Sequence, residues 1–263
     1  MQTLYIKFGL HQLTCHHRAE AWTYSEPYLW NVFFKIDGST VRLNDQFQLE
    51  GKPSYQISTG SHGNLHAKDI RSGESIGIPK EVGEWKTSLV PIRIPYFESG
   101  ISGLVGVVSV LMEQNYVSPK GAEAGHQALN DYIMKAIDAS IGGFDPKRVD
   151  ILDIDGSIKK YFDVQVEEFS QKIGNLVGQA VANAQSVVQN ILSLVNKDVV
   201  IGYKIWDFSN AGIEKAGGEV NFRQRWTTRK YGDWELRGAI TGKKDPDTAN
   251  AIKRKPSKEE EEE

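Results

Sequence analysis

Histidines and a single cysteine are the residues whose types could bind a metal or do thiol chemistry, and most of them lie early in the chain. His62 and His66 have the spacing of two imidazoles on one helical face, but Gly60 and Gly63 argue against a helix there. Zinc binding by these histidines with Cys15 is one hypothesis, and solvent-exposed strand and loop histidines are the alternative. The early histidines are His11, His16, His17, His62 and His66.

No short catalytic motif occurs in the chain. A nucleophile elbow, a phosphate-cradling Gly-Lys-Ser/Thr loop and a dinucleotide fingerprint are all missing. Cys15 ends a predicted strand with nothing to lower its thiol pKa, so we interpret it as semi-buried and inert. An EF-hand aligned on Gly156 would place Ile151 and Phe162 at ligand positions, which excludes that motif. The sequence therefore predicts a non-enzymatic protein.

Composition and charge are those of an ordinary globular chain. Its 263 residues are 40% apolar and 25% charged, with a net charge of −3, so a single large β-rich domain is expected. That small net charge argues against nucleic acid as a partner. Neither a signal peptide nor an apolar run long enough to span a membrane is seen, so we expect a cytoplasmic protein, with non-classical export left open.

Strand-like segments stand on both sides of a helical region. Asp37-Gly38 is the best hairpin turn, predicted to join residues 28–36 to a return strand from residue 40. The nearly continuous apolar run at 104–112 indicates a strand covered on both faces, and residues 60–83 form a long loop. The remaining predicted strands are 3–15, 54–59, 85–94 (an edge, because of its prolines), 199–208, 220–227 and 234–240.

Two helices are predicted between the strand groups. Leu129, Ile133 and Ile137 recur at helical spacing within residues 119–141, and a second, longer helix is predicted at 164–195. We therefore expect a sandwich built from residues 1–115 and 198–242 and a helical insertion over 116–197. A disordered, charged tail is expected over 243–263.

The segment from Glu20 to Leu29 resembles the first loop of a synaptotagmin-type C-two domain. That family is an eight-stranded antiparallel sandwich of calcium-dependent lipid-binding modules, whose first loop carries an acid and a second acid six residues later. Glu20 and Glu26 take these two positions here, and Pro27-Tyr28 match the family motif directly. The resemblance implies a mainly β, C-two-like sandwich, here interrupted by a two-helix hairpin.

The third loop of that family provides a second point of resemblance. Its acid-x-acid pair corresponds to Glu113 and Asn115, and the polar residue that closes the loop before Ile-Gly corresponds to Asp198. Glutamates stand where the family usually has aspartates, and Val199 and Val200 precede the Ile-Gly pair. The helical insertion then lies inside this third loop.

The resemblance implies calcium as the cation and loop carboxylates as its ligands, because calcium prefers several carboxylate oxygens. It also places Trp22 and Tyr24 at a loop tip that could contact a membrane or a partner. We therefore expect a binding module that meets a membrane surface or a protein through its loops. Self-association through the helices and membrane perforation by them are the alternatives. The implied calcium ligands are Glu20, Glu26, Glu113, Asn115 and Asp198.

Overall fold

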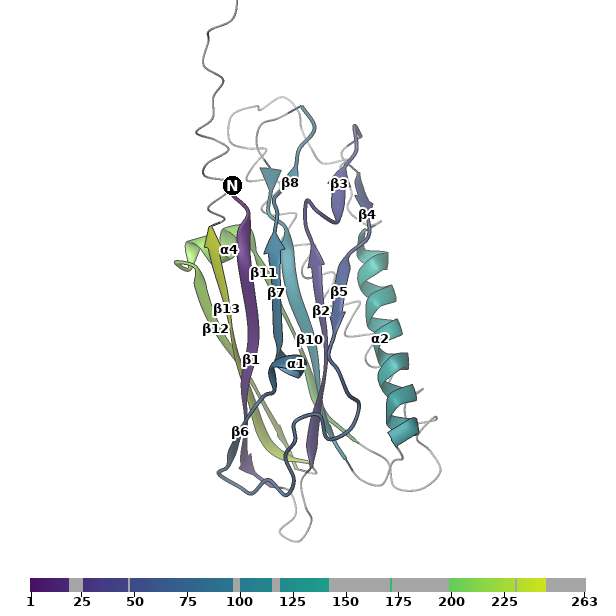
Figure 1. The fold of residues 1–263 in the computed structure, drawn as a ribbon, viewed down its shortest axis with the longest axis vertical. Coiled ribbons are helices and arrows are strands. Elements are labelled where there is room, and N and C mark those ends of the chain that lie inside the picture. The colour runs from purple at the N-terminus through teal and green to yellow at the C-terminus, as the bar shows by residue number, and fades with distance from the viewer. Residues whose placement is uncertain are drawn as a thin grey trace, which may run out of the picture.

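The computed structural model describes residues 1–18, 26–46, 48–96, 100–114, 119–141, 171, 199–229 and 231–244. Over these residues the chain is mainly β, with antiparallel sheets and a few helices (Figure 1). This class agrees with the expectation from the sequence. Apart from residue 171, the second helix predicted at 164–195 lies outside the described residues, as does the tail beyond residue 244.

The strands fall into two groups along the chain, one before and one after the long helix. The described helices are α1 (Lys80–Gly83), α2 (Pro119–Ile141) and α4 (Asn210–Lys215). The strands are β1 (Leu4–His17), β2 (Pro27–Ile36), β3 (Val41–Leu43), β4 (Leu49–Gly51), β5 (Ser54–Ile57), β6 (Ser75–Gly77), β7 (Glu84–Leu89), β8 (Ile92–Arg93), β9 (Gly100–Ile101), β10 (Leu104–Glu113), β11 (Val199–Ser209), β12 (Glu219–Thr228) and β13 (Gly232–Lys244).

The long strand β1 organises a five-stranded sheet. It pairs with β13 on one side and with both β6 and β7 on the other, and β12 pairs with β13. Leu4 lies opposite Lys244, so the first and last described strands run side by side (Figure 1). Among the described residues β7 pairs only with β1, which confirms the predicted edge character of this segment.

A four-stranded sheet joins the chain on both sides of α2. Its order is β11-β10-β2-β5, so β10, which precedes the helix, pairs with β11, which follows it. The predicted union of the two strand groups is therefore present in this sheet. Since β2, β10 and β11 are antiparallel, β2 begins where β10 ends and β11 begins.

The two sheets pack face to face through alternate side chains of their strands. From β1 this core takes Phe8 and Leu13, and from β2 it takes Leu29 and Phe33. The Phe8 and Phe33 rings meet edge to face with centroids 5.6 Å apart, a geometry that aromatic pairs prefer. Burial of this apolar surface is the main stabilisation of the sandwich-like arrangement.

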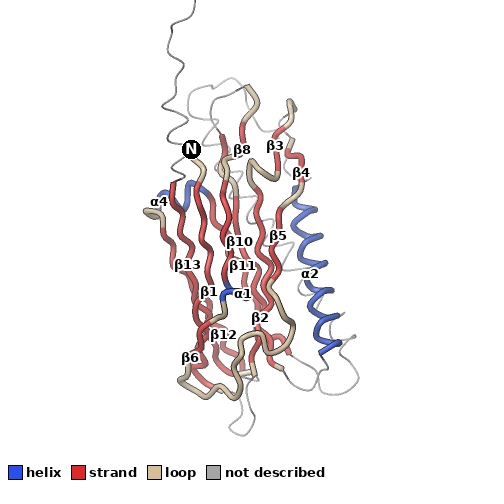
Figure 2. The backbone as a smooth tube through the Cα atoms, viewed as in Figure 1, coloured by secondary structure: helices blue, strands red, loops and turns tan. Residues whose placement is uncertain are grey.

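Helix α2 covers the outer face of the four-stranded sheet (Figure 2). Its predicted stripe of Leu129, Ile133 and Ile137 packs against the outward residues of β2 and β10, including Trp30 and Val110. Every residue of β2 is buried, and β10 is buried up to Met112, which confirms the predicted two-sided cover of residues 104–112.

No helix of the described residues has both the length and the apolar composition of a membrane span.

The predicted hairpin at Asp37-Gly38 is wrong, because β3 pairs with β4 and not with β2. The Asp37 carboxylate is fully buried and accepts hydrogen bonds from the Val90 N–H at 2.8 Å and the Ser39 hydroxyl at 2.6 Å. Lys35 Nζ lies 3.4 Å from the same carboxylate. These partners attach the turn to the end of β7, so the chain leaves the sheet and forms a separate two-stranded ribbon.

One side chain fixes the predicted 60–83 loop to the four-stranded sheet. The Asn64 amide accepts from the Leu29 N–H at 3.1 Å and donates to the Leu29 carbonyl at 2.7 Å. It thereby replaces a neighbouring strand at this position of β2. Leu65 and Ile70 are buried beside it, so the loop also contributes to the core between the sheets.

Replacing Asn64 by alanine should lower the free energy of unfolding by about 2 kcal/mol, because both backbone groups of Leu29 then stay buried without a partner. Urea unfolding followed by tryptophan fluorescence would measure the change. Asn221→Ala removes an exposed amide from β12 and should change stability by less than about 0.5 kcal/mol. Equal losses in the two variants would contradict the proposed anchoring.

Candidate functional site

The end of the four-stranded sheet where β2 begins, β10 ends and β11 begins is called the loop end below. Glu113 lies opposite Pro27 in one strand pair and opposite Val199 in the other. The Gln114 N–H donates to the Glu26 carbonyl at 3.1 Å. Two predicted ligand residues, Glu26 and Glu113, are therefore brought to the same end of the sheet, although they are far apart in sequence.

The other predicted residues of this site lie outside the described residues. They are Glu20, Trp22, Tyr24, Asn115 and Asp198. Each is close in sequence to a strand terminus at the loop end, since the 19–25 segment precedes β2, residue 115 follows β10 by two positions, and Asp198 directly precedes β11. Their participation in a shared site remains a prediction.

Cys15 lies near the loop end but is not set up as a nucleophile. Burial raises the pKa of its thiol to about 11, the positive charge of Arg18 opposes that rise, and the negative charge of Glu113 adds to it. The side chain is fully buried. At neutral pH it is a protonated thiol, in agreement with the inert role predicted for it.

The histidine pair considered for zinc is divided between different partners. The His62 ring packs against Tyr28 with centroids 5.1 Å apart, whereas His66 Nε2 lies 3.7 Å from a carboxylate oxygen of Glu81. Within the described part of the chain, no three His, Cys, Asp or Glu side chains are grouped so that they could hold a metal ion. A cation site at the loop end would therefore need ligands from the segments that are not described.

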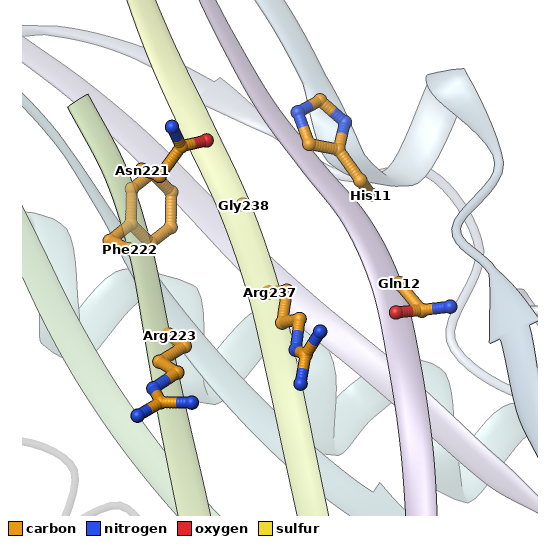
Figure 3. A pocket seen from close by; sticks show the side chains of 7 residues that line it. All are labelled: His11, Gln12, Asn221, Phe222, Arg223, Arg237 and Gly238. Atoms are coloured by element: carbon orange, nitrogen blue, oxygen red, sulfur yellow. The ribbon is translucent and has the colours of Figure 1, made fainter. Parts of the chain in front are cut away.

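A second candidate site is a groove on the outer face of the five-stranded sheet, here called the arginine groove (Figure 3). It crosses β12, β13 and β1 and encloses about 570 Å³. Arg223 on β12 and Arg237 on β13 are directly opposite in the strand register. The residues lining the groove are His11, Gln12, Asn221, Phe222, Arg223, Arg237 and Gly238.

Ion pairs surround the arginine groove and neutralise part of its charge. Arg237 pairs with Glu235, whose side chain is only 5% exposed, and His16 Nε2 lies 3.6 Å from the other oxygen of that carboxylate. Burial raises the pKa of Glu235, but the hydrogen bond and charge of Arg237, together with His16 and Arg223, outweigh burial and lower it overall. Glu235 is therefore ionised at neutral pH.

A neighbouring ion pair on the same two strands, Arg225 with Asp233, satisfies both of its charged groups. Arg225 donates from Nε and Nη2 to the two carboxylate oxygens of Asp233 at 2.7 and 2.6 Å. The hydrogen bond from Arg225 lowers the pKa of Asp233. This two-point contact leaves Arg225 little capacity for another anion, whereas Arg223 is not paired in this way.

The arginine groove was not anticipated from the sequence. Residues 220–227 were predicted as a strand, and alternation alone would place Asn221, Arg223 and Arg225 on one face. The facing position of Arg237 depends on the register between β12 and β13, which no short motif specifies.

No family model, curated protein or solved structure matches the chain.

Proposed function

We propose that the chain is a non-enzymatic binding module with a C-two-like sandwich, which meets a membrane surface or a protein partner through its loop end. The observation that supports this proposal is the strand register there. Glu113 stands beside Pro27 and beside Val199, so the segments before β2, after β10 and before β11 leave the sheet at the same end. Loops that leave a rigid scaffold together are a common location for binding sites.

Calcium is the cation proposed to link the loops. It takes about six to eight oxygen ligands, often carboxylates, and nearby carboxylates repel one another unless a cation lies between them. Glu26 and Glu113 would supply two of the carboxylates. The further ligands would come from Glu20, Asn115 and Asp198, and Trp22 and Tyr24 would contact the membrane or partner.

Calorimetric titration with calcium tests this proposal. The full chain should release or absorb heat and melt at a higher temperature in millimolar calcium, because a ligand that binds only the folded state stabilises it. Glu113→Gln should weaken calcium binding roughly tenfold, or about 1.4 kcal/mol. The matched control Glu219→Gln removes an exposed acid from β12 and should bind as the unchanged chain does. If millimolar calcium produces no heat and no thermal shift, calcium is removed from the proposal.

Self-association through the helical insertion is a separate candidate function. The apolar stripe of α2 already packs against the four-stranded sheet, so this helix keeps its apolar face within the chain. Assembly or membrane perforation would then depend on the helix predicted at 164–195. Light scattering over a range of concentrations tests assembly, which a strict monomer would contradict, and dye release from vesicles tests perforation.

A further inference from the structure

The two sheets differ in what covers their outer faces. Helix α2 packs on the four-stranded sheet, whereas β12 of the five-stranded sheet alternates exposed and half-buried residues along its whole length (Figures 1 and 2). The exposed positions of β12 include Asn221, Arg223 and Arg225. Among the described residues, the exposed positions of β12 leave the arginine groove open to a ligand.

Two like charges face each other in the middle of this open face. Arg223 and Arg237 occupy directly opposite positions of β12 and β13, an arrangement that destabilises an antiparallel pair by itself. Arg237 has Glu235 as its partner, but Arg223 has no carboxylate within ion-pairing distance among the described residues. The groove therefore carries a guanidinium that makes no direct ion pair with the described residues, although its charge also acts on Glu235.

Neutral donors complete the lining around these arginines. A shift of register between Leu10 and Gln12 places a bulge at His11, whose exposed ring lies over Gly9 at the rim of the groove. A Cβ at Gly9 would come within 2.5 Å of the His11 Cε1 atom, so glycine makes room for this ring position. Gln12 and Asn221 also line the groove, and the Asn221 amide nitrogen donates to Glu219 at 3.3 Å (Figure 3).

We propose that the arginine groove binds the phosphate group of a phosphate monoester. A guanidinium donates two parallel hydrogen bonds to an oxyanion, and two of them across a groove match an anion with more than two acceptor oxygens. The amide and imidazole groups at the rim provide further donors. The groove is open rather than closed, which leaves space for the organic group esterified to the phosphate. This site needs no calcium and lies on a sheet face, not at the loop end.

Calorimetric titration of the full chain with glycerol phosphate, in the presence of a calcium chelator, tests the proposal. Saturable binding is expected, with Arg223→Gln weakening it by roughly tenfold or more through loss of charge-assisted hydrogen bonds. Arg225→Gln is the matched control, since it removes the same charge two residues away from an arginine already held by Asp233. It should weaken binding by less than about twofold.

Parallel titrations distinguish a soluble phosphate ester from a lipid headgroup, and they test whether other anions bind equally well. Inorganic phosphate, acetate, and vesicles with or without phosphatidic acid are compared. Each titration is repeated on a variant with Glu259 to Glu263 all changed to glutamine, which tests whether that acidic run competes with the anion. Binding of glycerol phosphate alone supports a soluble ester, and binding of phosphatidic acid vesicles as well supports a lipid headgroup. The proposal is overturned by no binding in either background, by acetate binding equally well, or by equal losses in Arg223→Gln and Arg225→Gln.

Discussion

Replacing Trp30 by alanine should lower the free energy of unfolding by about 3–5 kcal/mol, the range for removal of a buried aromatic side chain. Trp30 is only 1% exposed and lies on the outer face of β2. Its ring stacks on the His126 ring of α2 with centroids 5.0 Å apart, and its indole N–H donates to the Ser61 carbonyl at 2.9 Å. One side chain thus joins the four-stranded sheet to the helix that covers it and, through Ser61, to the 60–83 loop.

Chemical unfolding of Trp30→Ala measures this loss, and Trp226→Ala is the control. Trp226 is half-buried at the edge of the five-stranded sheet, where its indole N–H reaches the Tyr203 carbonyl at 3.2 Å. Its removal should cost clearly less, because less apolar surface is lost from the core. If Trp30→Ala cost less than about 1 kcal/mol, α2 could not be packed on the sheet as described.

Acidification should destabilise the chain by up to about 3 kcal/mol through His126 on the buried face of α2. Burial lowers the pKa of this histidine to about 4, and the charge of Glu123 only partly opposes the shift. The unfolded chain, in which the histidine pKa is about 6.5, binds the proton first as the pH falls. Stability is therefore fully present above about pH 6.5 and is lost as the pH falls toward about 4.

His126→Phe identifies the source of this acid sensitivity. Phenylalanine keeps an aromatic ring against Trp30 but cannot be protonated, so unfolding measured between neutral pH and pH near 4 should lose most of its slope. His66→Phe changes an exposed histidine, with 73% of its side chain accessible, and should leave the slope intact. Identical pH profiles for His126→Phe and the unchanged chain would show that another group controls acid unfolding.

Strand content and the cover on β10 could be predicted because they depend on local patterns. The apolar run 104–112 has no polar face to give to solvent, and Leu129, Ile133 and Ile137 form a single stripe on α2. The pairing of β3 could not be predicted from the Asp37-Gly38 dipeptide. The buried contact of Asp37 with Val90, 53 residues along the chain, and its ion pair with nearby Lys35 fix the path of the chain there.

The candidate sites show the same division. Glu26 and Glu113 were predicted to lie near each other from loop motifs, and the residues next to them connect the two positions: the Gln114 N–H donates to the Glu26 carbonyl, and Glu113 pairs with Pro27. Arg223 and Arg237 become neighbours only through the register of β12 with β13, and His11 joins the lining through a bulge of β1. Such a groove is assembled from separate strands, so single-sequence patterns do not reveal it.

The most direct measurement of the proposed binding end is a nuclear magnetic resonance titration of the nitrogen-labelled full chain with calcium. Amide signals of Glu26, Glu113 and Val200 at the loop end should shift together and saturate, while those of Leu4 and Lys244 at the opposite end of the sheets stay in place. An absence of shifts at the loop end in millimolar calcium, or shifts spread equally over both ends, would contradict a calcium-linked binding module that acts through these loops.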